Sequence, residues 1–316
     1  MKKKLSMFMC TMFLVSFLGV PVVYSKEVTQ IQNKNVQLEQ IQNGNVQLKV
    51  DSKKKNKIPK RFRKTTDNIK TYGKSINLKG LSSLNASGSA QFTGQNVKMV
   101  KEEIGDVPIL VVDLREESHG FVNDLAVSWV GEEKNNGNKG LTKEQVLKDE
   151  SERLKGIKLN EELDIEKKEI IPTKVQDERE LTEENKMSYV RIPVTDTEGP
   201  TDEMVDYFIS IVKKTPPGTW MHFHCKAGIG RTTTFMTMYD IMKNAKDVSL
   251  EDIMERQILL GGKNLLKPSY KVGSKSSERS EFIKKFYEYV KENKDNFNTS
   301  WSEWLKNHKD SVKDLH

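Results

Sequence analysis

Three short apolar segments along the chain predict buried strands. They are residues 109–114 (Ile-Leu-Val-Val-Asp-Leu), 188–193 (Ser-Tyr-Val-Arg-Ile-Pro) and 220–225 (Trp-Met-His-Phe-His-Cys). The first is a near-continuous apolar run, which is typical of a parallel strand covered on both faces. Residues 125–130 also have the composition of a strand.

Helical spacing of apolar residues occurs between these segments. Residues 232–243 carry phenylalanine, tyrosine, isoleucine and methionine side chains at intervals that suit a helix. Helices are also predicted over 93–104, over 142–154 with Thr142 as its N-cap, and over 202–214 with Thr201 as its N-cap. Strands therefore alternate with helices, and loops at the carboxyl ends of parallel strands are expected to meet at one edge of the sheet.

The first 25 residues predict a signal peptide. Lys2 to Lys4 precede an apolar run over 5–23, and Val23-Tyr24-Ser25 suits cleavage after Ser25. The alternative is an uncleaved anchor, although the run is marginal against the ~20 apolar residues of a membrane span. We therefore expect a secreted or extracytoplasmic protein with no transmembrane segment in the mature chain.

Residues 26–57 are predicted to form a flexible basic leader. Residues 30–39 recur almost unchanged as 40–49, and their Gln/Asn-rich composition is typical of a flexible segment. Residues 26–90 contain 14 Lys and Arg against 4 Asp and Glu, within a chain of formal net charge +7. The basic run over 53–64 is either a solvated linker or a segment that attracts anionic surfaces. The globular domain is predicted to cover 58–316.

Cysteine content limits the chemistry. The sequence has two cysteines, and one of them, Cys10, lies in the predicted signal peptide. The mature chain would keep Cys225 alone, so we expect no intrachain disulfide. No cluster of residues has the spacing of a metal site, so no metal is predicted.

The segment around Cys225 has the pattern of a phosphate-binding loop. Two glycines, Gly228 and Gly230, follow the cysteine, and Arg231 follows it by six positions at the start of a predicted helix. Backbone amides of such a loop and the helix N-terminus attract anions, and the same field favours a thiolate. Arg231 can bind two phosphate oxygens. The alternative is a buried structural cysteine beside an ordinary strand-to-helix turn.

Two other loops are expected at the same edge of the sheet. The strand over 188–193 leads to Asp196, which can protonate a leaving alcohol and then activate water. The alternatives are that Asp196 caps the next helix, or that Glu198 is the acid. The strand over 109–114 leads to a charged loop that is either solvated or part of the pocket wall. Its candidates for that wall are Asp113, Arg115, Glu116 and His119.

Several longer motifs resemble one family. They are residues 113–123 (Asp-Leu-Arg-Glu-Glu-Ser-His-Gly-Phe-Val-Asn), 126–129, 222–233 (His-Phe-His-Cys-Lys-Ala-Gly-Ile-Gly-Arg-Thr-Thr) and 301–305. The sequence is similar to the bacterial protein tyrosine phosphatase-like phytases, cysteine phosphatases that act on myo-inositol phosphates. The resemblance covers about residues 58–310.

The resemblance implies roles for individual residues. Cys225 matches the nucleophile, Arg231 the phosphate-binding arginine, and Asp196 the general acid. Thr232 matches the hydroxyl that binds the cysteine sulfur, and His224 the residue that fixes the loop. The remaining matches are expected to contact or position the substrate; they are Lys226, Ala227, Gly228, Ile229 and Gly230 of the loop, Arg63, Asp113 and His119 at the pocket, and Arg256 and Gln257 near the loop or the attacking water.

Two departures from the family pattern stand out. The family usually has Asp-His-x-Trp-Pro after the general acid, whereas this chain has Asp-Thr-Glu-Gly-Pro over 196–200. The residue after the nucleophile is usually glutamate, and here it is Lys226. We expect this lysine at the pocket rim to favour a polyanionic substrate. Other basic residues expected in the pocket are Arg63, Arg115, Arg256, Lys267 and Lys271.

The resemblance implies an α/β fold with a parallel-rich central sheet flanked by helices, and a small accessory β region around 120–185. It implies phosphomonoester hydrolysis of myo-inositol polyphosphates through a phosphocysteine, without a cofactor. The alternatives are a secreted protein tyrosine or dual-specificity phosphatase acting on phosphoproteins, and a non-catalytic phosphoinositide-binding module. No nucleic-acid partner is predicted.

Overall fold

A computed structural model describes residues 46–53, 56–131, 135–267 and 274–308. The predicted signal peptide and the first part of the leader, residues 1–45, lie outside these ranges. None of the helices in the described ranges has the length and apolar character needed to cross a membrane.

The described ranges contain both strands and helices. The strands are β1 (Gln47–Ser52), β2 (Arg63–Lys64), β3 (Ala86–Ala90), β4 (Ile109–Arg115), β5 (His119–Val122), β6 (Leu125–Val130), β7 (Leu163–Ile165), β8 (Lys168–Ile170), β9 (Val175–Gln176), β10 (Ser188–Val194) and β11 (Trp220–Cys225). The helices are a 3-10 turn, η1 (Ser82–Leu84), and α2 (Asn96–Ile104), α3 (Lys143–Lys155), α4 (Glu178–Glu184), α5 (Asp202–Lys214), α6 (Gly230–Asn244), α7 (Leu250–Leu259), α8 (Lys275–Glu292) and α9 (Trp301–Asn307).

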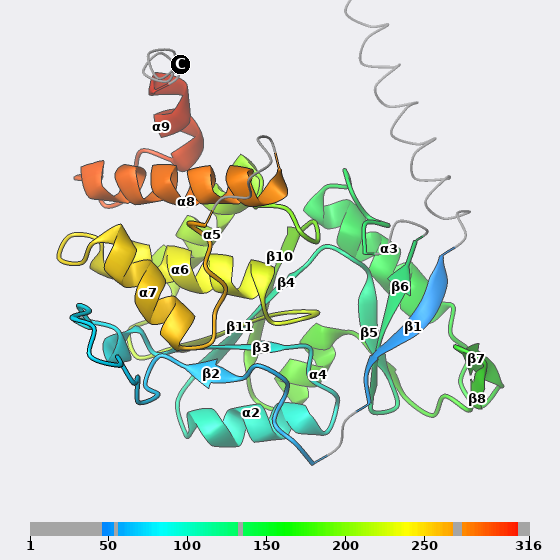
Figure 1. Cartoon of the computed structure of the whole chain (residues 1–316). Coiled ribbons are helices and arrows are strands. Elements are labelled where there is room, and N and C mark those ends of the chain that lie inside the picture. The colour runs from blue at the N-terminus through cyan, green and yellow to red at the C-terminus, as the bar shows by residue number, and fades with distance from the viewer. Residues whose placement is uncertain (1–45, 54–55, 132–134, 268–273, 309–316) are drawn as a thin grey trace, which may run out of the picture. The chain divides into compact units, whose positions relative to one another are not determined.

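The central sheet has the strand order β10-β4-β11-β3-β2. The first four strands are parallel, and only β2 pairs antiparallel, with β3, at the edge. Helices lie on both sides of this sheet, with α5 and α6 on one side and α2 and α4 on the other (Figure 1). The predicted α/β class with a parallel-rich sheet is confirmed.

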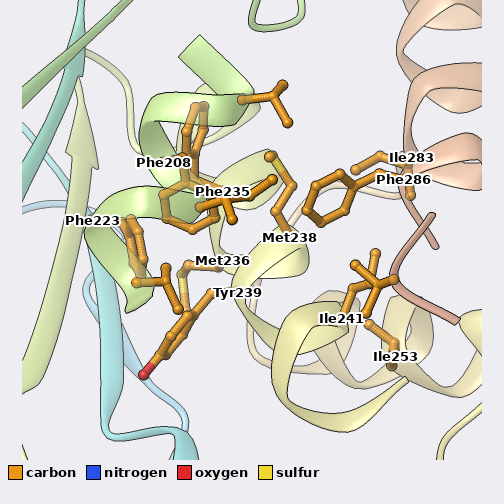
Figure 2. Packing of buried hydrophobic residues seen from close by; sticks show 14 of the residues in the cluster. Phe208, Phe223, Phe235, Met236, Met238, Tyr239, Ile241, Ile253, Ile283 and Phe286 are labelled. Carbon is orange, nitrogen blue, oxygen red and sulfur yellow. The ribbon is translucent and has the colours of Figure 1, made fainter. Parts of the chain in front are cut away.

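Alternation along β11 sorts its side chains between the two faces, because successive residues of a strand point in opposite directions. Met221, Phe223 and Cys225 belong to the large apolar cluster formed with α5 to α9. Figure 2 shows Phe223 beside residues of α5 and α6 in this cluster. Phe223 is fully buried, and truncating such a side chain to alanine typically costs about 3–5 kcal/mol.

The opposite face of β11 carries Trp220, His222 and His224. Trp220 packs in a smaller apolar cluster with residues of α2, α4 and β4. Both histidines are fully buried, and their rings stack at a centroid distance of 6.3 Å. Cys225 and the two histidines that precede it, His222 and His224, therefore face opposite layers of the fold.

A second, antiparallel sheet has the order β1-β6-β5-β9, and β7 and β8 form a separate hairpin. This is the predicted accessory β region, with one correction. Residues 47–52 were expected in the flexible leader, but they form β1 and pair with β6 from Gln47 opposite Val130 to Ser52 opposite Ala126. The predicted boundary at residue 58 is therefore wrong, because alternating apolar residues of β1 such as Leu48 and Val50 pack in the cluster around Val127.

The two predicted N-caps are confirmed. Thr142 caps α3 with a capping box, in which its side chain accepts from the amide of Gln145 and the Gln145 side chain accepts from the amide of Thr142. Thr201 caps α5 by accepting from the amide of Met204. Caps of this kind satisfy amides that have no partner within the helix.

Candidate active site

Three neighbouring strands of the central sheet end at one edge and supply the candidate site. β10 leads to a segment that we call the Asp196 loop (residues 195–200), β4 leads to Glu116 and Glu117, and β11 ends in the Cys225 loop (residues 225–231). In the parallel sheet β4 lies between the other two strands. The expected meeting of the cysteine and aspartate loops therefore occurs, with a third loop between them.

The thiol of Cys225 is nearly enclosed, with 2% of the residue exposed. The hydroxyl of Thr232 donates a hydrogen bond to Sγ at 3.2 Å, and the amide of Gly228 donates one at 3.3 Å. Burial alone would raise the pKa of this thiol, but the charge of Arg231 and these donors outweigh burial and lower the pKa. Lowering the pKa favours the thiolate, which is the nucleophilic form of cysteine.

The Cys225 loop requires a glycine at its bend. Gly228 has φ +71°, and a Cβ there would lie 2.4 Å from the amide nitrogen of Ala90 on β3. Two arginines hold the loop from the side of β2. Arg61 donates to the carbonyl of Ala227 at 2.7 Å, and Arg63 donates to the carbonyl of Gly228 at 3.0 Å.

Arg63 was expected to contact substrate, and the structure corrects this. Arg63 is 3% exposed, and its guanidinium also donates a hydrogen bond to the hydroxyl of Thr233. Burial lowers its pKa to about 10 despite the nearby charge of Cys225. Arg63 therefore positions the loop, because its guanidinium is bound to the carbonyl of Gly228 and to the hydroxyl of Thr233.

Arg231 begins α6 and is held by a carboxylate that we did not predict. Its Nη1 donates to Oε2 of Glu117 at 2.6 Å, and its Nη2 donates to Oε1 at 3.0 Å. Burial would raise the pKa of Glu117, but Arg231 and Arg115 lower it far below the ordinary range, so the carboxylate stays charged. A bidentate pair of this kind fixes both the position and the plane of the guanidinium.

Asp196 lies close to this pair. Its Oδ1 is 3.3 Å from Nη2 of Arg231, and its Oδ2 accepts from the side-chain amide of Asn135 at 2.8 Å. About a third of the Asp196 side chain is exposed. The carboxylate is therefore accessible and borders the guanidinium expected to bind phosphate.

Glu198, the alternative acid, has different surroundings. Its carboxylate lies 2.8 Å from Lys139 Nζ and 3.0 Å from Lys275 Nζ. Hydrogen bonds from both lysines lower its pKa, with the bond from Lys139 as the largest cause. A carboxyl that resists protonation is poorly suited to donate a proton, so the geometry favours Asp196 over Glu198.

The Asp196 loop is also held from α8. Arg279 donates to the carbonyl of Thr197 at 2.6 Å and to the carbonyl of Glu198 at 2.9 Å. A Cβ on Gly230 would lie 3.4 Å from Nη1 of Arg279, so this guanidinium also borders the Cys225 loop. Sequence patterns alone gave no reason to select Arg279, since α8 is remote in the chain.

A row of buried polar residues crosses the sheet beneath the loop. The strand registers align Arg191 of β10, Asp113 of β4, His224 of β11 and Ser89 of β3. Arg191 Nη1 lies 2.9 Å from Asp113 Oδ2, and His224 Nε2 lies 2.5 Å from Glu178 Oε1. His224 is fixed next to Cys225, which is consistent with its predicted positioning role.

Asp113 and His119 were expected in the pocket, and this expectation is wrong. Both residues are fully buried, and His119 Nε2 lies 3.2 Å from Asp113 Oδ2. Burial would lower the pKa of His119, yet the carboxylates of Asp113 and Glu150 prevail and raise it to about 9. The pair is part of the buried charge network, because its members bind one another instead of facing the pocket.

One group in the described ranges has the spacing of metal ligands. Donor atoms of Asp113, Glu178 and His224 lie within 4.8 Å of one another. These side chains already have partners, since Arg191 lies 2.9 Å from Asp113, and His119 lies 3.2 Å from Asp113 and 3.4 Å from Glu178. The three side chains therefore belong to the buried charge network beneath the Cys225 loop.

The expected roles of Arg256 and Gln257 are also wrong. Both side chains donate to the carboxylate of Asp240, and both are buried. Asp240 lies nine residues beyond Arg231 on α6, which is about 13 Å along a helix that rises 1.5 Å per residue. These two side chains fasten α7 to α6.

The predicted pocket cations are mostly engaged in pairs. Arg115 is fully buried and contacts Asp51 and Glu117.

Lys226 Nζ lies 2.8 Å from Asp51 Oδ1 and donates to Asn135 and Ser128 at 3.0 and 3.3 Å. An ammonium has three donors, and all three of Lys226 have partners, so Lys226 is not the free rim cation that we expected. Lys271 lies outside the described residues.

The fold and the site together define a class. A parallel sheet delivers a buried cysteine into a glycine-containing loop, and an arginine six positions later begins the next helix. This is the arrangement of the protein tyrosine phosphatase-like class.

Comparisons with known proteins identify the family. The family model for the PTP-like phytases, whose description reads "Inositol hexakisphosphate", matches residues 142–243 of this chain. A PTP-like phytase from Bdellovibrio bacteriovorus has 32% identity and a TM-score of 0.71, and the match covers 83% of this chain and 95% of that protein. The chain belongs to the PTP-like phytase family.

Two further matches are longer proteins. The PTP-like myo-inositol phosphatase of Mitsuokella multacida, solved with myo-inositol-(1,3,4,5)-tetrakisphosphate, has 34% identity and a TM-score of 0.76, over 90% of this chain and 54% of that one. The effector protein HopD2 of Pseudomonas syringae pv. tomato is 28% identical over 267 residues, which are 77% of this chain and 56% of HopD2. The chain thus spans about half the length of these two relatives.

Proposed function

We propose that this chain is a cysteine-dependent phosphomonoester hydrolase that removes phosphate groups from myo-inositol polyphosphates. The observation that carries the proposal is the convergence of a Cys225 thiol of lowered pKa, a clamped Arg231 and an accessible Asp196 at one edge of the sheet. Family membership supports the substrate class, as does the inositol tetrakisphosphate bound to the Mitsuokella relative.

The chemistry proceeds in two displacements. The Cys225 thiolate attacks phosphorus, so that an S–P bond forms while the P–O bond to the inositol carbon skeleton breaks. Asp196 gives its proton to the departing alkoxide. Water then attacks the phosphocysteine, Asp196 takes a proton from that water, and inorganic phosphate leaves as the S–P bond breaks. The thiolate is restored without a cofactor.

Arg231 and the first amides of α6 stabilise the transferred phosphoryl group. A helix N-terminus has amides without intrahelical partners and a partial positive charge, so it favours an anion. Glu117 fixes the guanidinium in advance, which reduces the reorganisation needed in the transition state. The same guanidinium borders Asp196, which brings the proton donor to the leaving-group side.

The test compares kcat/KM for inositol hexakisphosphate and for a phosphotyrosine peptide, with Cys225→Ser as the control. We expect efficient release of phosphate from the inositol substrate and a loss on the order of 10⁶-fold in the variant, as for other removed nucleophiles. Greater efficiency on the peptide would make the protein a tyrosine phosphatase. Undiminished turnover by the variant would exclude the covalent mechanism.

We also propose that the protein is exported. The basic start and apolar run of residues 1–25 support a signal peptide, and one relative is described as an effector protein. The test is the amino-terminal sequence of protein recovered outside the cytoplasm of the producing cell. A mature start at Lys26 is the expected result, and full retention of the chain in the cytoplasm would contradict the proposal.

A further inference from the structure

An aspartate of the first described strand reaches the base of the Cys225 loop. The register of β1 against β6 shifts between Val50 and Ser52, so Asp51 sits at a β-bulge. Bulges redirect a side chain and are frequent beside active sites. The Asp51 side chain is 1% exposed, although β1 is an edge strand of its sheet.

The two oxygens of Asp51 serve two cations. Oδ2 lies 2.8 Å from Nη2 of Arg115, and Oδ1 lies 2.8 Å from Nζ of Lys226. The hydroxyl of Ser128 donates to Oδ1 at 2.9 Å. Burial would raise the pKa of Asp51, but Arg115 and Lys226 lower it, so the group is a buried carboxylate between two cations.

The first branch from Asp51 leads to the phosphate-binding arginine. Arg115 Nε donates to Oε1 of Glu117 at 2.9 Å, and the same oxygen accepts from Nη2 of Arg231 at 3.0 Å. Asp51, Arg115, Glu117 and Arg231 therefore form a chain of alternating charge, with each side chain at most 2% exposed. Buried charges of this kind are costly to leave unpaired.

The second branch leads to the general-acid candidate. Lys226 directly follows the nucleophile and donates to the side-chain oxygen of Asn135 at 3.0 Å. The amide nitrogen of Asn135 donates to Oδ2 of Asp196 at 2.8 Å. One carboxylate of β1 is thus connected to both Arg231 and Asp196.

We propose that Asp51 is a positioning residue for the phosphoryl-transfer site, so that β1 is part of the active-site architecture. Without its carboxylate, Arg115 and Lys226 lose their common counter-charge. Arg115 then draws more strongly on Oε1 of Glu117, the oxygen that it already shares with Arg231. The inference rests on the proposed function for its effect on turnover, whereas its effect on the thiol needs no substrate.

The test uses Asp51→Asn in the full chain, with Asp106→Asn as the matched control at an exposed aspartate. Two quantities are measured: the pH dependence of Cys225 alkylation by iodoacetamide, and kcat and KM for inositol hexakisphosphate. We expect a shifted pKa of the Cys225 thiol and a kcat lowered about 10–100-fold with little change in KM, since a ~1 Å misplacement of reacting groups can cost ~10²-fold. The control should match the wild type in both.

An unchanged alkylation profile together with an unchanged kcat in Asp51→Asn would overturn the proposal. If the wild type does not hydrolyse the inositol substrate, the alkylation profile alone decides, so failure of the proposed function is distinguishable. If Asp51→Asn does not fold, Arg115→Lys tests the same chain, because lysine keeps the charge but cannot contact Asp51 and Glu117 together. A wild-type thiol pKa in a folded Arg115→Lys protein would then contradict the proposal.

Discussion

The Cys225 loop and the Asp196 loop lie at the same edge of the sheet but are held in different ways. The Cys225 loop is packed against β3, is supported by buried charges, and has no room for a Cβ at Gly228. The Asp196 loop is partly exposed and is held mainly by side chains from distant elements, such as Arg279 and Asn135. A nucleophile needs fixed geometry, whereas a proton donor beside an entering substrate needs some freedom to move.

Of the variants that test this difference between the two loops, one in the Asp196 loop is expected to lower turnover the most. We expect Asp196→Asn to slow the hydrolysis of inositol hexakisphosphate by ~10²–10⁴-fold, the usual range for general acid catalysis. Hydrolysis of an aryl phosphate with a good leaving group should fall much less, because that leaving group departs without a proton. Steady-state kinetics on both substrates provide the measurement. Equal losses on the two substrates would assign the proton to another group.

A pair of glycine variants tests the difference in packing directly. In Gly228→Ala the new Cβ meets the backbone of β3 at a positive φ, whereas Gly199 has no atom within 4 Å of its would-be Cβ and no such φ. We expect Gly228→Ala to lose ~1–3 kcal/mol of stability from backbone strain and about 10²-fold in turnover. Gly199→Ala should remain within about threefold of the wild type.

Thermal unfolding and steady-state kinetics of the two glycine variants provide the measurements. If Gly199→Ala were as damaging as Gly228→Ala, the contrast between a packed loop and a tolerant loop would not hold.

The sequence was informative where chemistry is local along the chain. The strand, the glycines, Cys225, Arg231 and Thr232 fall within a short stretch, so their arrangement follows from the strand-to-helix turn itself. The parallel sheet was predictable for a similar reason, since its apolar strands and capped helices each have a local pattern.

The partners of these residues were not predictable, because folding brings them from distant positions. Glu117 reaches Arg231 across 114 positions, and Asn135 reaches Asp196 across 61. The sequence does not distinguish a charged residue that becomes buried in an ion pair from one that faces solvent or a pocket. This explains the wrong pocket assignments of Asp113 and Arg256. The first half of β1 lies at the end of a repeat of flexible composition, so the pairing of β1 with β6 was missed as well.

Arg279 offers a smaller perturbation of the Asp196 loop. Its guanidinium donates to two carbonyls of that loop, and lysine retains the charge but cannot reproduce the planar pair of donors. We expect Arg279→Lys to lower kcat about tenfold on the inositol substrate, with an unchanged pKa of the Cys225 thiol. Kinetics and alkylation profiles of the same preparation provide the measurement. A shifted thiol pKa would show that Arg279 acts on the Cys225 loop instead.

The smallest expected effect concerns Glu116. Its carboxyl accepts a hydrogen bond from the Asp196 loop, and its pKa is affected by the charge of Arg231 in the Cys225 loop. The hydroxyl of Thr195 donates to Oε1 of Glu116 at 3.0 Å. Burial raises the pKa of Glu116 to about 7; the charges of Glu117 and Glu198 act in the same direction, while Thr195 and Arg231 act against them. The folded protein therefore binds a proton here more tightly than the unfolded chain does.

The sign of the pH effect follows from that difference. A carboxyl with a raised pKa stabilises the fold fully below its ordinary pKa of 4.5 and loses this contribution as the pH rises through about 7. We expect the Tm of the wild type to fall more between pH 5 and pH 8 than that of Glu116→Gln, by about 2–4 °C for each 1 kcal/mol. Calorimetry of both proteins across this range is the measurement. Parallel Tm curves would mean that Glu116 does not titrate between pH 5 and pH 8. The contact between Thr195 and Glu116 would then not depend on the protonation of Glu116 in this range.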